Sequence, residues 1–257
     1  TAITSGANNT ALGYQALQST TSAQDVTAIG FKSLQANTTG TGTAVGEASL
    51  YSNTTGADNT AIGRQALYNN TTAANNTAVG RSALMANTTG SENTAVGLSA
   101  LAANTTAASN SAFGFKSLFT NTTGIQNTGL GESTLRANTT ASNNTAVGFS
   151  ALTAITTGHT NTAIGKSALA AGTTGTNNTA VGANAMYQGA VTGNYNIAVG
   201  TSSLRFLTSG SSNVAIGINS LEANTTASNN TAVGMSSLAA NTTGGDNVAL
   251  GKSALQA

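Results

Sequence analysis

A glycine that recurs at every seventeenth position constrains this chain more than any other feature of its sequence. The spacing changes only twice, being one residue shorter between Gly30 and Gly46 and one residue longer between Gly182 and Gly200. Each glycine lies in a similar string, with the consensus N-T-A-V-G-x-x-A-L-x-A-N-T-T-G-x-x. Because self-similarity at a fixed period indicates stacked repeats, we expect residues 1–257 to form a single continuous array. The recurring glycines are Gly13, Gly30, Gly46, Gly63, Gly80, Gly97, Gly114, Gly131, Gly148, Gly165, Gly182, Gly200, Gly217, Gly234 and Gly251.

This period favours β-structure over helices. Paired-helix repeats need about 33 residues or more, and Thr, Asn, Gly and Val are weak helix formers. The apolar residues come in two short clusters, Ala-Val and Ala-Leu, divided by glycine and by Asn-Thr-Thr-Gly. Short strands separated by turns fit this pattern better. The sequence therefore predicts an all-β fold, a parallel β-solenoid of about 15 coils of 17 residues, with two or three short strands closing each coil.

Stacked coils would align equivalent residues in columns, and two of these columns are large and apolar. The residue before each glycine is Leu, Ile, Val or Phe, and the residue four after it is leucine in every unit except one, which has Met186. We predict that these two columns form the core. The alanine two residues before the glycine would then lie on the opposite face with the glycine. Both are small, so another chain could approach that face closely.

Asparagine forms two further columns, one four residues before the glycine and one after the leucine. Stacked asparagines bond amide to amide along a ladder, and asparagine also satisfies turn backbone. We therefore predict a structural ladder at a corner of the coil. The residues assigned to it are Asn59, Asn76, Asn93, Asn110, Asn127, Asn144, Asn161 and Asn178.

Composition excludes several classes of function. Only 6% of the residues are charged, against about 25% in a typical soluble domain, so no basic patch for nucleic acid is expected. The absence of cysteine excludes disulfides and zinc–thiolate sites. One histidine, His159 in a turn, cannot form a multi-histidine metal site. No apolar stretch approaches the ~20 residues that span a bilayer. We predict no catalytic residue, no cofactor, no metal site and no membrane insertion.

Four acidic residues share one column, just before the first asparagine row: Asp25, Asp58, Glu92 and Asp246. Calcium needs six to eight oxygen ligands at about 2.3–2.6 Å, whereas carboxylates two coils apart would be separated by roughly 10 Å. We therefore interpret these residues as solvated acids.

Aromatic residues provide a candidate surface contact. Tyr51 and Tyr68 occupy equivalent positions in adjacent units, and Phe119 lies in the same column further along the chain. Stacking along the column, or contact with another copy, is one interpretation. Binding of a cell-surface glycan is the other.

Glycosylation is a further hypothesis, because Asn-Thr-Thr is an acceptor motif for N-linked sugar. Glycans on every unit would not fit at a spacing of about 4.8 Å, so only sparse modification is considered. The candidate residues are Asn37, Asn53, Asn87, Asn104, Asn121, Asn138, Asn224 and Asn241.

The N-T-A-V-G-x-x-A-L motif resembles the repeat of YadA-like head domains of trimeric autotransporter adhesins. It is more similar still to the N-T-A-x-G-x-x-A-L-x-x-N-T-T-G repeats of tail-fibre-like proteins of phages and bacteria. The resemblance covers the whole chain. It implies a left-handed parallel β-roll, often trimeric, on a virion or a cell surface, with a structural or adhesive role.

We accordingly expect a non-catalytic extracellular fibre or filament component, either phage tail-fibre-like or a bacterial surface adhesin. The sequence shows no distinct capping segment, so we expect a segment of a longer fibre or a subunit that stacks head to tail. Expected partners are further copies of the chain, as a trimer or a filament, and a host-surface glycan. Two alternatives stay open: a glycosylated surface-layer or filament protein, and an ice-binding solenoid. Against ice binding, the adjacent threonines of Asn-Thr-Thr point to opposite faces if extended.

Overall fold

The computed structural model describes residues 5–256 as short strands and turns, with no helix among them. The chain divides into two compact units, Thr1–Gln126 and Asn127–Ala257. The first unit contains β1 (Thr10–Leu12), β2 (Val26–Ile29), β3 (Gly42–Val45), β4 (Asn59–Ile62), β5 (Thr77–Val79), β6 (Thr94–Val96) and β7 (Ser111–Phe113). The second contains β8 (Thr128–Leu130), β9 (Thr145–Val147), β10 (Thr162–Ile164), β11 (Thr179–Val181), β12 (Ile197–Val199), β13 (Val214–Ile216), β14 (Thr231–Val233) and β15 (Val248–Leu250).

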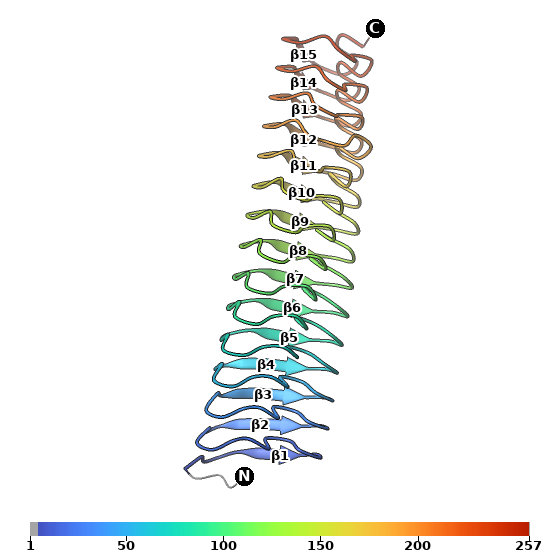
Figure 1. Cartoon of the computed structure of the whole chain (residues 1–257). Helices are drawn as coiled ribbons and strands as arrows, with labels where there is room; N and C mark the ends of the chain where they lie inside the picture. The colour runs from blue at the N-terminus through green and yellow to red at the C-terminus, as the bar shows by residue number, and fades with distance from the viewer. Residues whose placement is uncertain (1–4, 257) are drawn as a thin grey trace. The chain divides into compact units, whose positions relative to one another are not determined.

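Within each unit the strands pair in parallel and follow one another in chain order (Figure 1). In the first unit Thr77 pairs with Thr94 and Ala78 with Ala95, so each residue lies beside its equivalent in the next coil. The predicted all-β parallel β-solenoid is thereby confirmed. One detail was wrong: each coil holds one strand of three or four residues, and turns rather than further strands close it.

The two irregular spacings leave the strand register intact. In the shortened coil, Val26 of β2 pairs with Gly42 of β3. Gly42 has a φ of 141°, a conformation that side-chain-bearing residues rarely adopt, and it begins β3 directly after the shortened turn. In the lengthened coil, Thr179 of β11 pairs with Ile197 of β12. Changes of one residue are therefore absorbed in the turns.

The interior is formed by different columns from those predicted. The leucine column is buried, as expected, but the alanine column shares the interior with it: Ala78 and Leu84 are both fully buried. The residue before the glycine instead points outward, and Ile62 is 42% exposed. The physical reason is the small width of the coil, because only a small side chain fits between the strand and the leucine opposite it.

Left-handed backbone explains why the inner column is leucine. Leu84 has a φ of 51° and Met186 a φ of 50°, and Ser82, two residues after its glycine, has a φ of 57°. This conformation is least tolerable for β-branched side chains. Neither column contains Val, Ile or Thr in any unit. The turns therefore select leucine, serine and long unbranched side chains at these positions.

Candidate functional site

Both asparagine columns form hydrogen-bonded ladders inside the coils. In the first column, Nδ2 of Asn93 donates to Oδ1 of Asn76 over 3.2 Å, and the backbone N of Asn93 donates to the same oxygen over 2.9 Å. In the second, Nδ2 of Asn104 donates to Oδ1 of Asn87 over 2.9 Å. The predicted ladder is therefore present, and a second one runs beside it.

In coils that carry both asparagines, the two ladders meet at a shared carbonyl. The oxygen of Ala107 accepts from Nδ2 of Asn93 over 2.8 Å and from Nδ2 of Asn104 over 3.0 Å. Asparagine suits this position because its short amide offers two donors and one acceptor. These bonds satisfy the buried turn backbone, which would otherwise lose its contact with water without compensation. The ladders therefore hold the coil closed.

In the second unit the second ladder is replaced in part by apolar side chains. Ile155 and Leu207 occupy positions equivalent to the asparagines, and both are fully buried. An apolar side chain at this position has no amide group of its own that needs a hydrogen-bond partner. In this unit the first column continues, with Nδ2 of Asn161 donating to Oδ1 of Asn144 over 3.1 Å.

Burial bears directly on the glycosylation candidates. Asn87 and Asn104 are fully buried, and the amide nitrogens that would carry the sugar donate hydrogen bonds within the coil. A glycan on either nitrogen would replace these bonds and has no route out of the closed coil, so the folded structure disfavours this interpretation. Asn241 differs because it is only half-buried. The candidates that share full burial are Asn37, Asn53, Asn87, Asn104, Asn121, Asn138 and Asn224.

The acidic column lies on exposed turns. Asp25, Asp58, Glu92 and Asp246 all have φ between 56° and 62°, the left-handed region that asparagine and aspartate tolerate best. Turn geometry thus explains their column. Each carboxylate accepts a side-chain hydrogen bond from an adjacent coil, at 3.0 to 3.2 Å. Among residues 5–256 no group of three acidic or histidine side chains could hold a metal ion.

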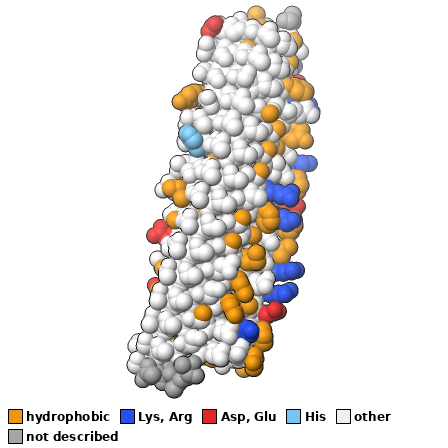
Figure 2. Space-filling view, in the orientation of Figure 1, with side chains coloured by type: hydrophobic (Ala, Val, Ile, Leu, Met, Phe, Trp, Pro, Cys, Tyr) orange, Lys and Arg blue, Asp and Glu red, His pale blue; other side chains and the backbone are white. Residues whose placement is uncertain are grey.

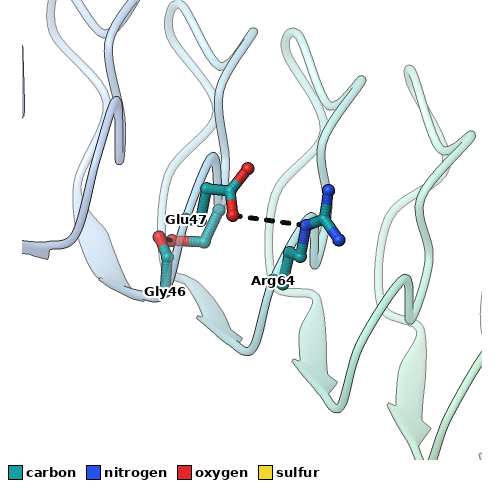
Figure 3. Close-up of polar contacts among 4 residues, drawn as sticks. Gly46, Glu47 and Arg64 are labelled. Atoms are coloured by element: carbon teal, nitrogen blue, oxygen red, sulfur yellow. Dashed lines mark hydrogen bonds and ion pairs between the residues drawn. The ribbon is translucent and has the colours of Figure 1, made fainter.

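His159 is exposed, and its Nδ1 lies 3.5 Å from Oγ1 of the adjacent Thr160. Figure 3 shows one of two ion pairs in the described part of the chain, between Arg64 and Glu47 on neighbouring coils. Its atoms are 3.3 Å apart and both side chains are 50% exposed.

The aromatic column, five residues after the glycine, lies on the outside of the first unit. The rings of Tyr51 and Tyr68 stack with centroids 5.0 Å apart and planes within 3°. Met85 and Phe119 follow on later coils, and the small Ala102 lies between them. A hollow of about 410 Å³ opens at Ala102. This hollow was not anticipated from the sequence.

The outward face of the strands is partly apolar. In the first unit Ile62 and Phe113 are 42% and 38% exposed, and in the second Ile164 is 42% exposed. Threonine or serine lies beside them on the same face, two residues earlier in the strand. In the part of Figure 2 that holds the first unit, the Lys and Arg side chains in view and many of the apolar side chains gather along one edge, and acidic side chains are also visible at the opposite edge.

Comparisons of the chain with protein-family models, with curated proteins and with solved structures give no significant match. None of the residues from 5 to 256 forms a helix that is long and apolar enough to cross a membrane. The fold therefore defines the class of the molecule, a parallel β-solenoid built on asparagine ladders.

Proposed function

We propose that this protein is a non-catalytic structural component of an extracellular fibre or filament, located on a virion or a cell surface. The motif similarity to phage tail fibres and YadA-like adhesin heads favours that setting, and with it a left-handed coil. Coils bonded to one another by backbone and asparagine side chains provide a stiff scaffold. Surface adhesion would be an additional role of its exposed columns.

The observation that carries this proposal is the apolar outer face of the strands. The same column presents Ile62 in the first unit and Ile164 in the second, each 42% exposed. A repeated apolar column is complementary to the same column of another copy, because both have the same period. Burial of such side chains contributes about 1.5–3 kcal/mol each. We therefore place the contact between copies on this face, instead of on the alanine–glycine face.

Sedimentation velocity provides the test. The protein should sediment as a small multiple of 25.0 kDa, most simply as three chains, or as longer filaments. The double variant Ile62→Lys, Ile164→Lys should shift the species towards the mass of one chain, because each ammonium would have to be desolvated at the contact.

A matched control adds the same charge elsewhere. Thr89 and Thr174 are exposed residues of the Asn-Thr-Thr and Gly-Thr-Thr turns, away from the strands. The variant Thr89→Lys, Thr174→Lys should keep the wild-type mass. A wild-type protein of 25.0 kDa, or dissociation of both variants alike, contradicts the proposal.

Ice binding is the second candidate, and one observation favours it. Thr60, Thr77 and Thr94 form an outward rank in register with a rank of Ile and Val, and no hydrogen bond within residues 5–256 occupies the hydroxyls of Thr77 and Thr94. A flat periodic array of hydroxyl and methyl groups is suited to ordering water. This use needs the face to be free, so the two candidates predict opposite assembly states. A monomer that shows thermal hysteresis favours ice binding; absence of hysteresis removes it.

A further inference from the structure

In the aromatic column of the first unit, one position between two large side chains carries only alanine. Tyr51 and Tyr68 show the spacing of the column, with ring centroids 5.0 Å apart. At Ala102 the column carries only a methyl group, so Met85 and Phe119 face one another across two such spacings. The result is the hollow of about 410 Å³, a volume within the usual range for small-ligand sites. The gap between Met85 and Phe119 therefore leaves room for one inserted ring.

The second unit repeats this arrangement, which identifies alanine as its cause. There Ala170 precedes Tyr187 in the same column, and a hollow of about 400 Å³ opens beside them. Its other lining residues are two alanines and Gln188. An alanine that is followed by an aromatic residue therefore leaves one ring face uncovered in both units.

The hollow at Ala102 differs from the second one in its polar rim. Ser82 and Ser99 line it from adjacent coils, and neither hydroxyl makes a hydrogen bond with any residue from 5 to 256. Lys116 lies in the same column as these two serines, on the next coil. Its Nζ lies 5.4 Å from the ring centroid of Phe119, and it forms no ion pair with a described carboxylate. The floor consists of Ala86, Ala102 and Ala103.

We propose that the hollow at Ala102 binds one pyranose ring that carries a carboxylate, as in a uronic acid of an acidic polysaccharide. The C–H face of the sugar stacks on Phe119, with Met85 on the other side. Its hydroxyls bond Ser82 and Ser99, and its carboxylate pairs with Lys116. An aromatic side chain of another protein would fill the same space but leave both serines without a hydrogen-bond partner and the ammonium, which lies over the rings of Phe115 and Phe119, without a counter-ion, so the sugar is favoured. The site lies within the first unit, so its failure leaves the proposed fibre role intact.

Titration with sodium glucuronate, followed by methyl NMR of Met85 and Ala102, tests this assignment on the full chain. Glucuronate should shift both methyl signals with a dissociation constant of about 1 mM, a value typical of a small, open site. Glucose should bind at least about fivefold more weakly, for lack of the ion pair. Benzoate, an aromatic acid without ring hydroxyls, should also bind more weakly. Absence of binding by glucuronate, or equal or tighter binding of glucose or benzoate, overturns the proposal.

Two variants make the test specific. Ala102→Phe completes the column with a residue that Phe119 already places there, so the fold should persist and the Met85 shift should disappear. Ala239→Phe is the control, because it introduces the same side chain in the same column between Glu222 and Gln256. It should leave binding unchanged. Lys116→Gln should reduce glucuronate binding to the level of glucose. Wild-type binding by Ala102→Phe, or unchanged preference in Lys116→Gln, contradicts the assignment.

Discussion

Gly80 lies so close to Gly97 of the next coil that a Cβ on Gly80 would be 2.7 Å from the carbonyl oxygen of Gly97. The φ of Gly80 is 128°, a region that residues with a side chain rarely enter. The recurring glycine is therefore required twice, for its backbone conformation and for the approach of adjacent coils. The fixed period of the sequence reflects this contact.

We expect Gly80→Ala to destabilise the coils locally. Backbone strain costs about 1–3 kcal/mol, and the overlap with Gly97 adds to it. Gly251→Ala is the matched control, because its φ is 119° but nothing lies within 4 Å of the added Cβ. Hydrogen exchange of the Gly97 amide, which donates to Val79 over 2.8 Å, measures the opening of the coils at Gly80. In the control, exchange of the amide of residue 251 itself, which donates to Val233, measures the effect of backbone strain alone; the equivalent amide in the first variant is that of residue 80, which donates to Ile62. Equal effects of the two variants would mean that the close approach of Gly80 to Gly97 contributes nothing to the destabilisation.

Replacement of Leu84 should depend on branching rather than on size. Its φ of 51° disfavours a branched Cβ. Leu84→Met should cost less than about 1.5 kcal/mol, since Met186 occupies this position naturally. Leu84→Ile should cost about 1–2 kcal/mol more, from the left-handed backbone. Denaturant unfolding of the two variants gives the comparison, and an isoleucine variant as stable as the methionine variant would contradict the backbone explanation.

The fold could be predicted from the sequence because its main determinants repeat. The glycine spacing indicated stacked coils, and the position of asparagine indicated ladders such as Asn93 on Asn76. Each determinant is local to one coil, so fifteen copies reinforced the same interpretation.

The predicted direction of the strand side chains was wrong because a large apolar side chain was interpreted as a sign of burial. Large apolar residues are common on protein surfaces, and Ile62 is one of them. A usable signal was present in the variation within each column. The outer column accepts Val, Ile, Leu and Phe, whereas the alanine column varies only once, at Gly129. A uniform column indicates tight packing. The hollow at Ala102 lay beyond such reasoning, because it depends on which side chains flank one alanine.

The ion pair of Arg64 and Glu47 should contribute little. Both side chains are half-exposed, so solvent screens their attraction. A double-mutant cycle with Arg64→Gln and Glu47→Gln should give a coupling energy below about 1 kcal/mol, decreasing further at high salt. A coupling that is larger, or insensitive to salt, would assign these charges a structural role that the ladders do not explain.

Asn93→Ala should be far more damaging than loss of a surface asparagine. The side chain of Asn93 donates to Ala107 over 2.8 Å, and its Oδ1 accepts from the backbone N of Asn110 over 3.0 Å. The variant removes the acceptor of a buried backbone N–H, so we expect a loss of about 2–4 kcal/mol.

Asn69→Ala provides the control for this substitution. Asn69 is exposed, and its amide makes no side-chain hydrogen bond with the described residues, so its replacement should change stability by less than about 0.5 kcal/mol. Denaturant unfolding compares the two variants, and hydrogen exchange at Asn110 locates the defect. If Asn93→Ala proved as mild as Asn69→Ala, the ladder would be a consequence of stacking. If the predicted difference is found, the ladder is one of the causes of stacking, because of these two side-chain amides only that of Asn93 bonds to adjacent coils.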